Sequence, residues 1–85
     1  MEFDSDDARK RLADLVQREH PLKAMRLYLE CKQDWNVRYG IIECYERLSG
    51  SKPGDLIALE LYRTHRIGKD IDNDTMEELR KRFIE

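Results

Sequence analysis

The chain has 85 residues, a length that fits one folded domain, so we predict a single domain spanning residues 1–85 with no room for a separate catalytic domain. Its 16 basic and 18 acidic residues give a net charge of −2, which provides no long-range attraction toward nucleic acid or an anionic membrane. No apolar run approaches the roughly 20 residues that span a bilayer, so we expect no membrane partner.

Two features of the sequence bear on the cellular compartment. Cys31 and Cys44 form no CxxC motif and fall at apolar helix positions, so we predict reduced thiols in the core rather than a disulfide. The first seven residues are acidic and lack an apolar stretch, which predicts that no signal peptide is present. Both features favour the reducing environment of the cytoplasm.

Apolar residues at helical spacing predict five helices, and no segment alternates as a strand would. The predicted ranges are, in chain order, 5–20, 21–31, 35–48, 53–66 and 74–83. Pro21 opens the second helix immediately after the first one, so these two helices should meet in a tight corner. Asp34 is expected to cap the third helix, and Gly50 is expected to end it in a left-handed conformation.

The last two helices have their own boundary signals. Gly68 is expected to end the fourth helix, and Asp74 with Glu77 forms a capping box for the fifth. The first and fifth helices are apolar on one narrow face, whereas the middle three are apolar over wide arcs and should be packed on most sides. We therefore predict an all-α fold of five short helices stacked as antiparallel helical hairpins, as a bundle or a mini-solenoid.

A weak internal repeat accompanies this pattern. The segment Ala24–Tyr28 recurs at Ala58–Tyr62, an offset of 34 residues. A repeat length near 34 residues is typical of helix–turn–helix repeats. The stretch Ile41–Gly50 resembles the first helix of a pentatricopeptide-type repeat, Ala58–Tyr62 its second helix, and Asp74–Leu79 the start of the next repeat. Tetratricopeptide repeats fit less well. The resemblance implies a ligand groove along residues 35–48, and it leaves open whether RNA or protein is the ligand.

Residue patterns that would indicate an enzyme or a metal site are incomplete. Three acidic residues alternate as in an EF-hand calcium loop: Asp70, Asp72 and Asp74. That pattern then fails, because Thr75 stands where a glycine is needed and Lys81 where a glutamate is needed. His20 and His65 have no metal-ligand partner one helical turn away. No nucleophile motif is present, so we expect no catalysis, no metal and no cofactor.

The third predicted helix carries the leading candidate for a binding site. Trp35, Tyr39 and Ile42 lie at positions i, i+4 and i+7, and aromatic residues of this kind are enriched at interface hot spots. Arg38 and Glu46 lie beside them. If the stripe faces solvent, it is a partner-binding groove; if a flanking helix covers it, it is core. The leading hypothesis is a protein–protein interaction module that acts as an adaptor, a small regulator or an inhibitor.

A basic cluster after the fourth helix supports a different hypothesis. Arg63, Arg66 and Lys69 could hold phosphates, which would make the chain an RNA- or DNA-binding helical module. Phosphate binding collapses as salt rises, while an apolar groove is nearly indifferent to salt. A third alternative is that the Trp35 stripe closes a homodimer.

Overall fold

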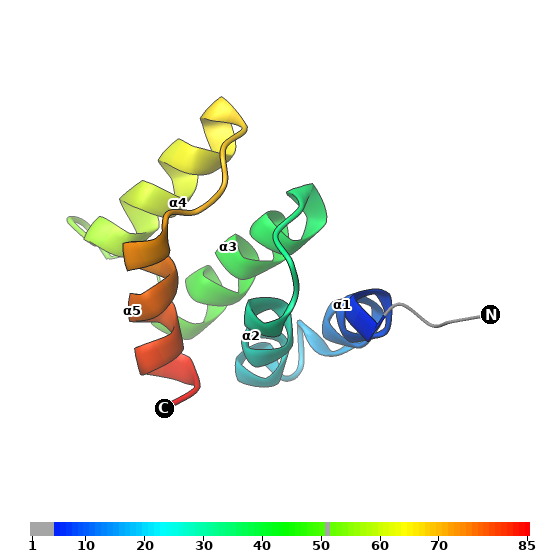
Figure 1. Cartoon of the computed structure of the whole chain (residues 1–85). Coiled ribbons are helices and arrows are strands. Elements are labelled where there is room, and N and C mark those ends of the chain that lie inside the picture. Colours follow the sequence, from blue (N-terminus) through cyan, green and yellow to red (C-terminus); the bar gives the residue numbers. More distant parts are fainter. Residues whose placement is uncertain (1–4, 51) are drawn as a thin grey trace.

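The computed structural model describes residues 5–50 and 52–85; residues 1–4, part of the acidic N-terminal stretch, and Ser51 lie outside the described residues. The described residues form five α-helices and no strand, which confirms the predicted all-α fold (Figure 1). The helices are α1 (Ser5–Val16), α2 (Pro21–Glu30), α3 (Trp35–Ser49), α4 (Leu56–Ile67) and α5 (Asn73–Phe83). None of them is long and apolar enough to cross a membrane.

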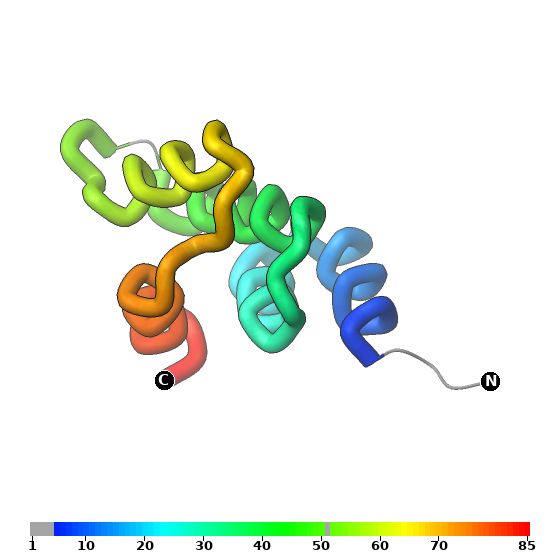
Figure 2. The backbone as a smooth tube through the Cα atoms, turned by 45° about the horizontal axis from the view of Figure 1, so that its top comes forward, coloured from blue at the N-terminus to red at the C-terminus, as the bar shows by residue number. Residues whose placement is uncertain are grey.

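The helices pack largely in chain order. The second helix, α2, packs against α1, α3 and α5, while α4 packs chiefly on α3 (Figures 1 and 2). The α3 and α4 helices run side by side in opposite directions (Figure 1). The chain then crosses back, so that α5 reaches α2 rather than extending the row.

The helix ends follow from local hydrogen bonding. The Asp34 carboxylate accepts a hydrogen bond of 2.8 Å from the Val37 N–H and caps α3, as predicted. Gly68 ends α4 as predicted, in the left-handed conformation with φ 70° and ψ 27°. Gly50 also follows α3 with a positive φ, but its ψ of 175° lies outside the predicted left-handed helical conformation. The predicted capping box of α5 is wrong: Asp72, not Asp74, accepts the hydrogen bond from a first-turn N–H.

Two helix boundaries differ from the sequence prediction by three or four residues, and the others agree to within one residue. The α1 helix ends at Val16 rather than His20, and residues 17–19 form a turn that leads into α2. The α4 helix begins at Leu56 rather than Pro53, because Asp55 accepts hydrogen bonds from two first-turn N–H groups and so fixes the start there.

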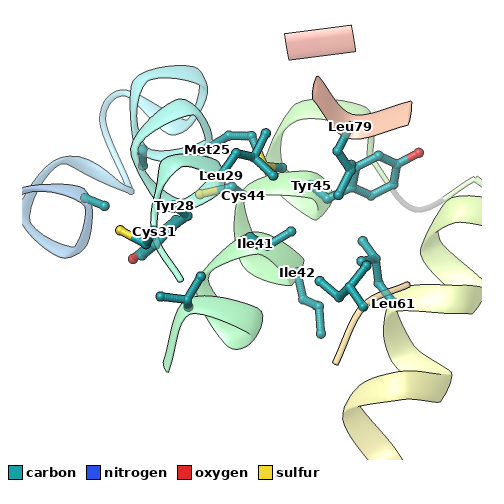
Figure 3. Packing of buried hydrophobic residues seen from close by; sticks show 14 of the residues in the cluster. Met25, Tyr28, Leu29, Cys31, Ile41, Ile42, Cys44, Tyr45, Leu61 and Leu79 are labelled. Carbon is teal, nitrogen blue, oxygen red and sulfur yellow. The ribbon is translucent and has the colours of Figure 1, made fainter. Parts of the chain in front are cut away.

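The core lies where α2, α3 and α5 meet. Met25 and Leu29 from α2 face Cys44 from α3, and Leu79 from α5 lies beside Tyr45 (Figure 3). All of these side chains are buried. They tie three helices into one apolar cluster, whose burial is the main stabilising contribution to the fold.

Tyr28 connects α1, α2 and α3. Its ring is buried against Gly40 of α3, where an added Cβ would lie 2.6 Å from Cε2 and 2.7 Å from Cε1. Its hydroxyl donates a hydrogen bond to the Asp14 carboxylate of α1. Burial raises the pKa of Tyr28, and the hydrogen bond to Asp14 raises it further. Gly40 therefore sets the spacing of α2 and α3.

The prediction that three middle helices are sandwiched is wrong for α4. Only Leu61 and Thr64 of this helix are buried, while Leu59 and Tyr62 are exposed. The reason is that α5 packs on α2 instead of covering the outer side of α4. Apolar residues that the sequence suggests for the core therefore lie at the surface.

The two copies of the weak sequence repeat lie in different environments. Tyr28 is fully buried, whereas Tyr62 at the matching position is exposed.

The prediction that both cysteines are reduced core residues is confirmed in structure, since Cys31 and Cys44 are both buried free thiols. Burial raises the pKa of both, and that of Cys44 reaches about 12.

Candidate functional site

An aromatic pair marks the N-terminal half of α3. The rings of Trp35 and Tyr39 stack nearly parallel, with centroids 5.5 Å apart and an interplanar angle of 5°. Their positions one helical turn apart on the same face make this stacking possible. Trp35 is 57% exposed and Tyr39 is 44% exposed, so the pair faces solvent over about half its surface.

The α4 helix completes the cluster with His65. Its ring lies 5.4 Å from the Trp35 ring and 5.7 Å from the Tyr39 ring, measured between centroids. The His65 Nδ1 atom is buried and has no hydrogen-bond partner among the described residues. The sequence did not assign His65 to this site, because only the packing of α4 on α3 brings it beside the aromatic pair.

Loop contacts place His65 beside the aromatic pair. The Gln33 side chain donates to the Ile71 carbonyl at 3.0 Å and accepts from the Ile71 N–H at 2.8 Å. The Arg38 guanidinium forms an ion pair of 2.6 Å with Asp70. Both contacts tie the loop after α4 to the start of α3, which holds the end of α4 next to Trp35.

A cavity lies at the other end of the same helix pair. It has a volume of about 340 Å³ and is lined by Glu46 and Gly50 from the end of α3, Ala58, Leu59 and Tyr62 from α4, and the loop between the two helices. Leu59 is 58% exposed and Tyr62 is 42% exposed. We define the α3/α4 surface as the exposed face formed by Trp35, Tyr39, His65, Tyr62 and Leu59.

The five residues predicted to bind a partner lie in different places. Trp35 and Tyr39 are exposed on the α3/α4 surface, and Glu46 is exposed at the cavity. Ile42 is a correction: it is only 6% exposed, because α4 covers it and Leu61 faces it (Figure 3). The side chain of Arg38 is mostly buried in its ion pair with Asp70, so it positions the loop and offers no free charge.

Acidic groups border the α3/α4 surface near the middle of α3. Glu43 accepts a hydrogen bond of 2.7 Å from the Gln17 side chain of α1. A hydrogen bond with Glu43 also raises the pKa of Tyr39. Glu46, one turn further on, has no ion-pair partner among the described residues.

The predicted basic cluster is partly neutralised within the chain. The Arg63 guanidinium donates two hydrogen bonds to Glu60, at 3.2 and 2.9 Å. Arg66 and Lys69 are exposed and form no ion pair within residues 5–50 and 52–85. Nucleic-acid binding by these three residues stays a prediction. Because Arg63 is paired with Glu60, only Arg66 and Lys69 of the predicted cluster offer unpaired positive charges among the described residues.

No constellation for metal binding occurs in the described parts of the chain, where no three of His, Cys, Asp or Glu lie close enough to hold an ion.

A second, wider cavity of about 700 Å³ lies at the start of α2 and is lined by His20, Pro21, Leu22, Lys23, Arg26 and Leu48. Arg26 donates to the Phe83 carbonyl at 2.6 Å. The cavity has exposed basic side chains but no buried polar group directed into it among those residues.

Comparison with known proteins gives no relative: no protein-family model, no curated protein and no solved structure matches the chain. The resemblance to pentatricopeptide-type repeats stays a prediction. Function is therefore inferred from the residues of this chain alone.

Proposed function

We propose that this chain is a non-enzymatic protein–protein interaction module, an adaptor, small regulator or inhibitor, that binds its partner through the α3/α4 surface. The observation that carries the proposal is the stacked, half-exposed pair of Trp35 and Tyr39. Tryptophan and tyrosine are enriched among residues that dominate binding energy at protein interfaces.

The size of the apolar surface supports the proposal. The exposed parts of Trp35, Tyr39, Leu59 and Tyr62 amount to roughly 300–400 Å² for side chains of this size. A contiguous apolar patch of this order is at the level where surfaces of monomeric proteins are often functional. Covering it with a partner removes this area from water, and that transfer favours association.

Order in the free chain also supports the proposal. Stacking on Tyr39 and contact with His65 restrict the rotamers of the Trp35 side chain before any partner arrives. An aromatic anchor that is already ordered loses less conformational entropy on binding than a mobile one. The α3/α4 surface therefore combines large apolar side chains with a low ordering cost.

Site-specific photocrosslinking tests the proposal. A photoreactive phenylalanine analogue replaces Tyr62 on the α3/α4 surface, and a matched control places it at Leu15, an 81% exposed position on α1. We expect a protein adduct of defined mass from position 62 and none from position 15. The crosslinked protein is then purified and its affinity for the chain is measured directly.

Substitution of the aromatic anchor makes the test quantitative. We expect Trp35→Ala to weaken the affinity for that protein by about 30-fold, equivalent to a hot-spot loss of about 2 kcal/mol, while Leu15→Ala leaves it unchanged. Equal affinities of the parent chain and the Trp35→Ala variant, with circular dichroism confirming that both are folded, would refute the proposal.

A further inference from the structure

The two ends of the α3/α4 surface carry a large exposed side chain and a cavity. One end carries the half-exposed indole of Trp35, and the other end carries the cavity of about 340 Å³ beside Leu59 and Tyr62. Trp35 begins α3 and the cavity residue Gly50 follows its last residue, so the two lie about 22 Å apart at the helical rise per residue. A surface that holds both a side chain and its receiving cavity can pair with a copy of itself.

We propose that the partner of the α3/α4 surface is a second copy of this chain, bound across a two-fold axis that lies in the interface over the exposed face of α3, level with the middle of the helix at Ile42. This inference rests on the proposed function of the surface. A two-fold axis perpendicular to α3 sets the two α3 helices antiparallel. The Trp35 indole of each copy then covers the cavity of the other copy, and the Tyr39 ring of each lies near Glu46 of the other.

The charges at the two ends are complementary in the same arrangement. Arg66, one residue after His65, is at the Trp35 end, and Glu46 is at the cavity end; both are exposed. Neither forms an ion pair within the described residues. The two-fold axis places Arg66 of one copy over the end of the surface that holds Glu46 of the other, twice per dimer. Lys52 also lines the cavity, where its ammonium group can meet the face of the incoming indole.

The available area matches what a dimer of this kind needs. A standard interface buries about 800 Å² on each partner, and slightly more than half of that area is apolar. The exposed parts of the four large apolar side chains supply roughly 300–400 Å², which is most of the apolar part. The remaining area of each partner's interface is polar and comes from the border of the surface, which holds Glu46, Lys52 and Arg66. The expected dimer is therefore reversible rather than obligate.

Analytical ultracentrifugation of the purified chain tests the dimer from about 1 μM to about 1 mM, a range that covers the affinities of reversible complexes. We expect a monomer–dimer equilibrium that Trp35→Ala weakens at least tenfold. Reversing either charge, with Glu46→Arg or Arg66→Glu, places like charges opposite each other and should also weaken the dimer. Combining both reversals restores the opposite pairing and should recover the dimer.

A control variant tests whether the dimer forms through the α3/α4 surface. Lys81→Glu reverses an exposed charge on α5, away from that surface, and should leave the equilibrium unchanged. A chain that stays monomeric throughout, or a double charge reversal that recovers nothing, would overturn the dimer. The photocrosslinking test distinguishes a failure of the dimer from a failure of the proposed function. If the chain is monomeric but crosslinks from position 62 to a different protein, and Trp35→Ala weakens that binding, the dimer is refuted and the proposed function still holds.

Discussion

Replacing Gly40 with alanine places a methyl group against the buried ring of Tyr28. The new Cβ would lie 2.6 Å from Cε2 and 2.7 Å from Cε1, whereas carbon atoms in contact prefer about 3.5–4 Å. The ring must therefore shift by about 1 Å, and it is held at its far end by the hydrogen bond to Asp14. Overpacking typically costs about 1–3 kcal/mol, and contacts this short place the cost in the upper part of that range, at about 2–3 kcal/mol. Alanine regains about 1 kcal/mol through its higher helix propensity.

The expected net effect of Gly40→Ala is a loss of about 1–2 kcal/mol in the free energy of unfolding, or a melting temperature lowered by roughly 5–15 °C. Urea denaturation followed by circular dichroism measures it. The same substitution in a Tyr28→Leu background should be neutral or stabilising, because the ring that clashes is gone. A Gly40→Ala variant as stable as the parent chain would refute the close packing of α2 on α3.

Three further predictions concern polar contacts and a buried thiol. The hydrogen bond from Lys10 and the bonds from backbone N–H groups lower the pKa of the Asp34 carboxyl. The charged carboxylate therefore stabilises the fold above about pH 4, and this stabilisation is lost as the pH falls through the lowered pKa. Asp34→Asn should be less stable than the parent by up to about 1 kcal/mol at pH 7, and a gap in unfolding free energy that persists in strong acid would contradict this. Tyr45→Phe removes the hydroxyl that donates to Asp55 at 2.6 Å and should cost about 1 kcal/mol in urea unfolding, and no loss would mean that this bond contributes nothing. Because burial raises the pKa of Cys44 to about 12, a thiol reagent at neutral pH should modify it at least about 100-fold more slowly in the folded chain than in urea; equal rates would show that the thiol is accessible.

The local structure was predictable because short-range interactions determine it. The apolar spacing located all five helices, and Asp34 was identified as a cap because its carboxylate needs only the next turn of the chain. Gly50 and Gly68 were identified because a positive φ favours glycine. Asp72 was missed as the cap of α5 because Asp74 offers the same side chain two residues later, and only the backbone geometry distinguishes the two.

The packing partners of α4 were not predictable from its pattern. A wide apolar arc indicates that a helix can be buried on several sides, but it does not say which neighbours arrive. In this chain α5 packs on α2, so Leu59 and Tyr62 remain at the surface. The contact of Tyr28 with Gly40 joins α2 and α3. It could not be predicted from either helix's local sequence, because it depends on how the two helices pack.

The candidate site was predictable only in part, for the same reason. Trp35 and Tyr39 were identified from their spacing on one helix. Ile42 continues the same stripe, yet the stripe turns under α4 at that position and Ile42 is buried. His65 and Tyr62 join the surface from α4, 23 or more residues away along the chain from Tyr39, and only the antiparallel packing of α3 and α4 brings them together.

The most direct test of the central claim is the fluorescence of Trp35, the single tryptophan, in the dilute chain. An indole on the uncovered α3/α4 surface predicts red-shifted emission and efficient quenching by acrylamide in the folded protein, approaching the values of the urea-unfolded chain. Blue-shifted emission that acrylamide does not quench at any dilution would place Trp35 in the core and contradict the existence of an exposed binding surface.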